Sequence, residues 1–295
     1  MDWDRLRVFH AVAEAGSFTH AGDTLNLSQS AVSRQISALE ESLQVPLFHR
    51  HARGLILTEQ GEALYRTVRE VFAKLAMTEA LLTESKEKPA GRLKVTTTVG
   101  FGAMWLAPRL QQFLEMYPDV SVSLLLDDLD LDLAMREADV AIRMHPPKQP
   151  DLVQRHLMTL EWHVCASADY LKRHGVPQRA EDLDAHKLIL FGGYHPPVQD
   201  INWLAEAGRR VGSPRQALLE VNNTQAMLLA IRAGVGIGTL PNFAMAAENH
   251  DLVHVLGHLN APKVDVFFVY PEELRNSKRV AVFRDFLLSR LAEIQ

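Results

Sequence analysis

The run SQSAVSRQISALE, residues 28–40, places hydrogen-bonding side chains on one face of a helix: Ser28, Gln29, Ser30, Ser33, Arg34 and Ser37. Val32, Ile36 and Leu39 recur at helical spacing and are expected to pack inward. Glutamine pairs naturally with adenine and arginine with guanine in the DNA major groove, where short side chains let the backbone come close. The run therefore indicates DNA recognition, against the plainer alternative of a solvated helix face. Arg34 could equally contact a phosphate, which would position the protein without reading bases.

The elements around this run fit the same chemistry. An amphipathic helix through Phe9 ends near Gly16, and a short helix follows over residues 18–25, with Ser17 as a plausible N-cap. Two helices, a short turn and a helix with a polar face are typical of a helix-turn-helix. After Pro46, two apolar segments flank the polar tip HRHARG and predict a two-stranded wing. The wing residues expected to contact the DNA backbone or minor groove are Arg50, His51 and Arg53.

A long helix is predicted next, capped by Thr58 and continuing to about residue 86. Its apolar residues follow the spacing of a coiled-coil seam, with Thr78 as one polar member: Leu64, Val68, Val71, Leu75 and Leu82. A helix of this length with one apolar stripe needs a partner, so we predict that it dimerises. The alternative is that the stripe packs against the protein's own body.

The overall composition carries no sign of nucleic-acid binding. The 295 residues have a formal net charge of -5, so the DNA prediction rests on local placement of charge. The single Cys165 fits a reducing compartment and is expected to be a small buried strand residue. The N-terminus lacks a secretory apolar region, and the longest apolar runs are too short to span a bilayer, so a cytoplasmic protein is expected.

Beyond the linker KEKPAG, residues 86–91, strands and helices alternate. This alternation predicts a parallel sheet with helices on both faces. The glycines of GVGIG, residues 234–238, follow a helix and lack the G-x-G-x-x-G spacing, so they predict a tight turn and no dinucleotide site. His250, His254 and His258 are four apart, but their segment favours a strand or loop over a metal-binding helix.

Two blocks of sequence resemble one family. GSFTHAGDTLNLSQSAVSRQISALEESLQVPLFHRHARGLILTEQGE resembles the DNA-binding segment of LysR-type transcriptional regulators. LKVTTTVGFGAMWLAPRLQQFLEMYPDVSVSL, ADVAIRM and AGVGIGTLP look like the effector-binding domain of that family, in the branch close to the glycine-cleavage activator and the beta-lactamase regulator. The resemblance covers essentially the whole chain, in the family's order. Gly22 stands where the family's second helix usually carries alanine.

The resemblance implies an α+β multidomain fold. It comprises a winged helix-turn-helix over residues 1–58, a linker helix and hinge over 59–90, and an α/β effector-binding domain over 91–295 that resembles periplasmic binding proteins. The last would have two lobes, lobe I (91–161 and 268–295) and lobe II (162–267), with the ligand in the cleft between them. The resemblance also implies a dimer of dimers on DNA.

Effector contacts are expected where strands end and helices begin, because free backbone N–H groups there attract anions such as a carboxylate. The candidates are Thr97, Thr98, Val99, Gly100, Phe101, Arg143, Phe191, Asn222, Asn223 and Thr224. For Thr98, Asn223 and Thr224 the alternative is helix capping alone, and for Arg143 it is a salt bridge within lobe I.

Taken together, the sequence predicts a DNA-binding transcriptional regulator controlled by a small-molecule effector, with no catalytic site, cofactor or metal. The alternative is a cytoplasmic small-molecule-binding protein or enzyme with an accessory helical domain.

Overall fold

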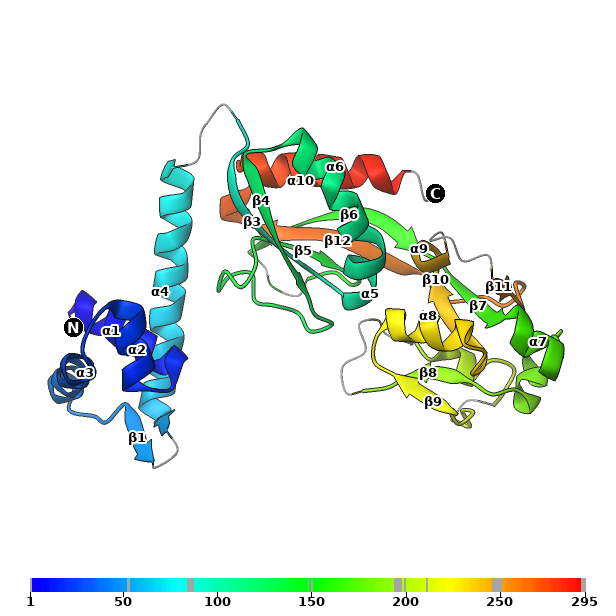
Figure 1. The fold of residues 1–295 in the computed structure, drawn as a ribbon, viewed down its shortest axis with the longest axis horizontal. Coiled ribbons are helices and arrows are strands. Elements are labelled where there is room, and N and C mark those ends of the chain that lie inside the picture. The colour runs from blue at the N-terminus through cyan, green and yellow to red at the C-terminus, as the bar shows by residue number, and fades with distance from the viewer. Residues whose placement is uncertain are drawn as a thin grey trace. The chain divides into compact units, whose positions relative to one another are not determined.

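The computed structural model describes residues 2–51, 54–83, 88–147, 149, 151–193, 198, 200–210, 212–245 and 251–292. The chain divides into two compact units, Met1–Leu82 and Thr83–Gln295 (Figure 1). Among the described residues, no helix is both long and apolar enough to cross a membrane.

The first unit is a helix-turn-helix with a wing, as predicted. Its elements are α1 (Trp3–Ala15), α2 (Phe18–Leu25), α3 (Gln29–Leu43), the hairpin β1 (Phe48–His51) and β2 (Gly54–Leu57), and α4 (Glu59–Thr83). One core joins the helices through fully buried side chains, among them Phe9, Val12, Val32, Ile36 and Leu39. The periodic apolar face of residues 28–40 is therefore what fixes α3 to the unit and leaves its polar face outward.

Glycine at position 22 has a local reason. The chain after α2 turns back so that Leu27 N–H donates to Gly22 O at 2.9 Å, and Asn26 takes a left-handed conformation with φ of 54°. A Cβ at position 22 would lie 2.6 Å from Leu27 O, closer than such contacts allow. The turn between α2 and α3 thus offsets the roughly 0.5–1 kcal/mol that glycine costs in a helix.

The long helix α4 begins as predicted, because Thr58 Oγ1 accepts from Gly61 N–H at 3.0 Å. Its apolar stripe divides into two parts. Val68 is buried in the core of its own unit, which corrects its assignment to a dimer seam. Leu64 packs against that core but is only half-buried, so its place in the seam stays a prediction. Val71 and Leu75 are 39% and 49% exposed and remain available to a partner, whereas the side chain of Leu82 lies outside the described residues.

Lobe I of the second unit is built on a five-stranded sheet in the order β4-β3-β5-β12-β6 (Figure 1). The strands are β3 (Gly91–Thr97), β4 (Val120–Leu126), β5 (Val140–Arg143), β6 (Leu152–Leu160) and β12 (Val264–Pro271). The first helix after β3 is broken into α5 (Val99–Phe101), a π-helical turn (Gly102–Leu106), a 3₁₀ turn (Ala107–Arg109) and α6 (Leu110–Met116). α6 meets the last helix, α10 (Lys278–Leu291), through the rings of Phe113 and Phe283, whose centroids are 5.1 Å apart.

Two expectations about this sheet are wrong. It is mixed, because β12 runs antiparallel to both β5 and β6, whereas alternating strands and helices predicted parallel pairing alone. Lobe I also begins its second segment at Val264 and not at Phe268, because Val264 already pairs with Leu160.

Lobe II has a three-stranded antiparallel sheet in the order β10-β7-β11 and a parallel pair, β8 with β9. The strands are β7 (Trp162–Ser167), β8 (Ile189–Phe191), β9 (Leu219–Val221), β10 (Gly238–Pro241) and β11 (Leu252–His254). The helices are α7 (Ala168–His174), α8 (Thr224–Arg232) and α9 (Asn242–Met245), with 3₁₀ turns at Ala180–Ala185 and Trp203–Ala205, and at Glu272–Leu274 beyond β12 in lobe I. Cys165 lies buried in β7, and burial raises its pKa to about 12, so its thiol is not nucleophilic at neutral pH.

Candidate DNA-binding surface and effector cleft

The polar face of α3 is presented to solvent. Ser28 caps the helix, since its Oγ accepts from Ala31 N–H at 3.2 Å and lies 3.1 Å from Ser30 Oγ. Of the predicted DNA contacts here, Ser33 is half-buried and the others are exposed: Ser28, Gln29, Ser30, Arg34 and Ser37. The structure thus brings a glutamine, an arginine and short hydroxyl side chains together on one exposed surface, which suits a groove-reading helix.

The wing is fixed to this helix by a carboxylate. Glu40 Oε1, near the end of α3, accepts from Leu47 N–H at 2.8 Å and from Phe48 N–H at 3.3 Å. Sequence analysis did not single out this residue, although its position just before the predicted wing was the available signal. Arg50 and His51 lie on β1, but their side chains, and all of Arg53, lie outside the described residues.

In lobe I, the residues at the end of β3 that were predicted to bind an effector make hydrogen bonds to other residues of the same lobe. Thr97 is buried and its Oγ1 donates to Ile142 O at 3.1 Å. Val99 N–H, a donor that could hold an anion, donates to Asp128 Oδ1 at 3.1 Å. Thr98 makes no side-chain cap hydrogen bond within the described part of the chain. An internal carboxylate therefore occupies the place expected for a ligand's negative group.

We expect Asp128→Asn to stabilise the protein at pH 7. Burial raises the pKa of the Asp128 carboxyl, the Val99 hydrogen bond opposes that rise, and the charge of Asp127 adds to it. Since the raised pKa makes the native state hold a proton more readily than the unfolded chain, the ionised form weakens folding at neutral pH. Asparagine keeps the acceptor and removes the charge; because the carboxyl is only half-buried, the gain is below about 1 kcal/mol.

The pH dependence checks the cause. Urea unfolding of both proteins should give a stability difference at pH 7 that disappears as the pH falls through the raised pKa toward the unfolded value of about 3.9. The same difference at both ends of that range would mean that charge on Asp128 is not responsible.

Arg143 is held within lobe I, as the alternative interpretation had it. This arginine is 6% exposed; its Nε lies 3.2 Å from Asp130 Oδ1 and its Nη2 donates to Leu131 O at 2.8 Å. His145 Nε2 lies 3.1 Å from the other oxygen of Asp130, and this hydrogen bond is the main reason that the pKa of His145 is raised. The acidic run DDLDLD, residues 127–132, was the sequence signal for these partners, and sequence analysis overlooked it.

The lobe II wall is formed by the start of α8 and the end of β8. Asn223 caps α8, with Oδ1 accepting from Ala226 N–H at 2.8 Å, and its amide also donates to Asn222 Oδ1. Phe191 is buried, and its backbone N–H and C=O are both held by the side-chain amide of Asn202. Asn223 therefore has a structural role, whereas Asn222 is exposed with its amide turned to its neighbour.

The two lobes touch where the predicted effector residues meet. A Cβ on Gly100 would lie 2.6 Å from Thr224 Cβ, so α5 and α8 are in direct contact. Beside them the Phe101 and Phe243 rings meet edge to face with centroids 5.3 Å apart. Two small hollows lie near this contact among the described residues, one of about 20 Å³ beside Arg143 and one of about 10 Å³ beside Phe191. Neither holds more than a water molecule or two.

No group of three or more His, Cys, Asp or Glu side chains that could hold a metal ion occurs among the residues the structure describes. Of the three spaced histidines, His254 lies on β11 and His258 in a loop, and His250 lies outside the described residues.

Comparison with known proteins gives one family for both units. A family model described as a bacterial regulatory helix-turn-helix protein of the lysR family matches residues 3–62, and one described as a LysR substrate binding domain matches residues 86–292. A curated relative, the HTH-type transcriptional regulator CrgA of Neisseria meningitidis, is 31% identical over 293 residues, covering 98% of this chain and 96% of the relative.

Solved structures of similar proteins match this chain over nearly its full length. That of CrgA is 29% identical with a TM-score of 0.63, covering 99% of both chains. That of the Vibrio cholerae virulence activator AphB is 27% identical with a TM-score of 0.64, covering 98% of this chain and 99% of AphB. CbnR complexed with its target DNA shares the fold at 23% identity, with a TM-score of 0.66 and full coverage of both chains.

Proposed function

Because the chain belongs to the LysR family of transcriptional regulators, we propose that it reads its operator with Gln29, Ser30 and Arg34 of α3. As a member of that family it binds DNA through its helix-turn-helix, oligomerises and carries an effector-binding domain. The observation that supports the proposed contacts is the exposed polar face of α3, held by a buried face of Val32, Ile36 and Leu39. Ser28, Ser33 and Ser37 complete this surface.

A binding titration tests the proposal. Purified protein is titrated against DNA from its own upstream intergenic region at two salt concentrations, with unrelated DNA as competitor. Operator binding should survive the competitor and weaken as salt rises, because phosphate contacts release counterions. Binding to the upstream region no tighter than to the competitor would contradict this choice of operator.

Oligomerisation proceeds through two kinds of surface. Val71 and Leu75 on α4 support a helix pair between two chains, since both are exposed apolar residues one turn apart. Each lobe also exposes large apolar side chains, Met116 and Leu125 on lobe I and Leu229 on lobe II. Contacts between such lobes would join dimers into a dimer of dimers.

The effector binds an arrangement of the lobes more open than the one described. Gly100 and Thr224 are in direct contact, and the two hollows beside Arg143 and Phe191 are too small for a metabolite. A ligand that binds only the open arrangement shifts the equilibrium toward it, by no more than its difference in affinity for the two arrangements. Lobe I does not support the expectation that the effector is a carboxylate. The two groups expected to bind one, the Arg143 side chain and the Val99 N–H, already contact Asp130 and Asp128 of the protein itself. The relatives are named as regulators, which points to ligand binding without turnover.

We expect Gly100→Ala to mimic the effector. Its methyl group would meet Thr224, so the closed contact cannot form and the DNA footprint should change without any ligand. Thr224→Gly in the same chain removes the obstructing atoms and should restore the original footprint. DNase I footprinting of the single and double variants measures this. An unaltered footprint in Gly100→Ala would disprove the link between lobe contact and DNA binding.

A further inference from the structure

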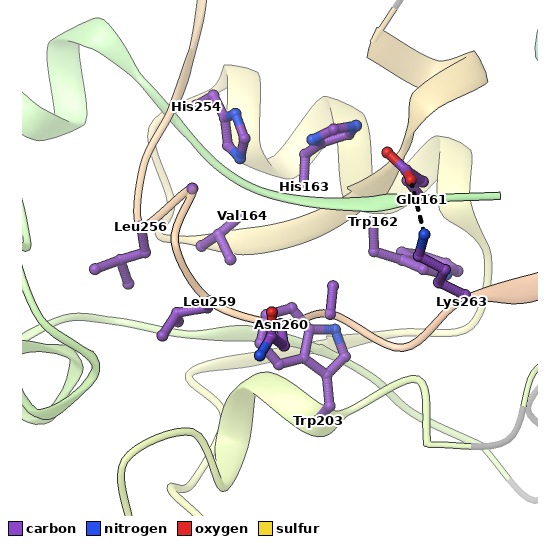
Figure 2. A pocket seen from close by; sticks show the side chains of 12 residues that line it. Glu161, Trp162, His163, Val164, Trp203, His254, Leu256, Leu259, Asn260 and Lys263 are labelled. Atoms are coloured by element: carbon purple, nitrogen blue, oxygen red, sulfur yellow. Dashed lines mark ion pairs between the residues drawn. The ribbon is translucent and has the colours of Figure 1, made fainter. Parts of the chain in front are cut away.

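A pocket lies at the joint between the lobes, outside the cleft. After β11 the chain makes its last contact with β7 at Val255, whose N–H donates to Val164 O at 2.9 Å, and it rejoins lobe I at Val264, opposite Leu160. Residues 256–263 bow away from the short stretch 161–163 and enclose a cavity of about 230 Å³. We call this space the hinge pocket; it is lined by Glu161, Trp162, Val164, Trp203, Asn260 and Lys263, among others (Figure 2).

An unpaired strand edge forms one side of the hinge pocket. β11 pairs only with Cys165, Ala166 and Ser167 of β7, and the ladder ends at Val164 O. Backbone groups in a strand alternate sides, and Glu161 O accepts from Asn242 N–H on the β10 side, so Trp162 turns its N–H and C=O toward the pocket. Within the described residues, neither group has a hydrogen-bond partner there. Pro262, on the opposite segment, has no N–H to offer.

The rest of the pocket is apolar on one side and charged at its edge. Figure 2 shows Trp203 and Leu259 facing Val164 across the space, with the Glu161–Lys263 ion pair at one end. That pair spans 3.4 Å, and its side chains are 59% and 72% exposed, so both charges are reachable from solvent. Burial and the neighbouring His163 lower the pKa of His254, so this imidazole adds no charge at neutral pH.

These features together suit one class of molecule. An isolated residue that pairs with Trp162 must accept from its N–H and donate to its C=O, as facing residues do in an antiparallel ladder. A free α-amino acid carries its carboxylate and ammonium at the spacing of a residue's own C=O and N–H. Lys263 and Glu161 then neutralise those two charges, and the wall of Val164, Leu259 and Trp203 accepts an apolar side chain. A cavity of about 150 Å³ accommodates benzene, so this one is large enough for such a side chain.

We infer that the hinge pocket is a binding site for a free α-amino acid with an apolar side chain. This site is additional to the proposed effector cleft. Trp162 also lines the small hollow beside Phe191 in that cleft, and residues 161 and 263 lie on the two segments that join the lobes. A molecule bound in the pocket therefore contacts both connections at once and biases the angle between the lobes.

Calorimetric titration of the full-length protein tests this without DNA, so its outcome is independent of the proposed operator contacts. The probes are L-leucine, 3-methylbutylamine, which lacks its carboxylate, and 4-methylpentanoate, which lacks its ammonium. We expect L-leucine to bind and each analogue to bind at least about tenfold more weakly, because each leaves one pocket charge and one Trp162 group unmatched.

Variants locate the site. Glu161→Gln and Lys263→Met should each weaken L-leucine binding about tenfold. Ala261→Phe should abolish it by filling the pocket, with the melting temperature checking that the variant folds. Glu272→Gln, which removes a similarly exposed pair with Arg275, is the control and should change nothing. The inference fails if none of the three probes binds at millimolar concentration, if 4-methylpentanoate binds as tightly as L-leucine, or if folded Ala261→Phe binds normally.

Discussion

Arg34→Ala is expected to abolish specific operator binding while leaving the fold and the dimer intact. Arg34 is exposed on α3, whose packing depends on Val32, Ile36 and Leu39 on the opposite face, so truncation removes no core contact. A bidentate arginine–guanine contact contributes about 1–3 kcal/mol of discrimination. A dimer reads two half-sites, so the loss should reach about 2–6 kcal/mol, which is roughly 30-fold to 10⁴-fold in affinity.

Fluorescence anisotropy with labelled operator and unrelated DNA measures this loss and also separates the two roles left open for Arg34. If Arg34 reads a base, operator affinity falls much more than affinity for unrelated DNA. If it binds phosphate, both fall together and the dependence on salt becomes shallower. Arg66→Ala on α4 is a control for the loss of one exposed positive charge in the same unit. Operator affinity unchanged from the wild type would remove Arg34 from the contact surface.

The parts of the structure that sequence predicted well depend on local rules. Ser28 caps α3 and Thr58 caps α4 because a hydroxyl just before a helix can accept from its first free N–H groups. The apolar spacing of Val32, Ile36 and Leu39 needs no knowledge of the partner to indicate a buried face. The wing, β1 and β2, was likewise predictable from local sequence, because two apolar segments flank a polar tip.

The parts that sequence missed depend on contacts between distant segments. The stripe on α4 is continuous in sequence, yet Val68 meets the core of its own unit and Val71 does not, which only the packing of α1–α3 decides. Local alternation predicted β12 as another parallel strand, but its direction follows from pairing with β6 more than a hundred residues earlier. Asp128 likewise accepts a hydrogen bond from the N–H of Val99, which is far from it in the sequence. The residues around position 99 therefore give no sign that the Val99 N–H already has a partner.

Arg215 is a buried charge in lobe II whose side chain makes several hydrogen bonds. It is 6% exposed, and its guanidinium donates from Nε to Asp184 at 2.6 Å, from Nη1 to Ala207 O at 2.6 Å and from Nη2 to Ala180 O at 2.9 Å. Its own N–H donates to Ala205 O. The Arg215 side chain therefore joins its own segment to the segments around Ala180–Ala185 and Ala207, none of which lies in a strand. The run GSPRQA gave no indication of this role.

Arg215→Met should lower the free energy of unfolding by about 3–5 kcal/mol, because it keeps the side-chain volume but leaves the carbonyls of Ala180 and Ala207 without a donor. Arg215→Lys should recover little of the lost stability, since one ammonium group cannot reach the three acceptors that the planar guanidinium contacts. Arg209→Met is the matched control: Arg209 also contacts Asp184, at 3.1 Å, but its side chain is 31% exposed, so its loss should cost at most about 1 kcal/mol. Urea unfolding, followed by intrinsic tryptophan fluorescence, to which Trp203 beside these loops contributes, measures all three. Equal costs for Arg215→Met and Arg209→Met would mean that solvent reaches the loop carbonyls once the guanidinium is gone, and that burial of Arg215 adds nothing to lobe II.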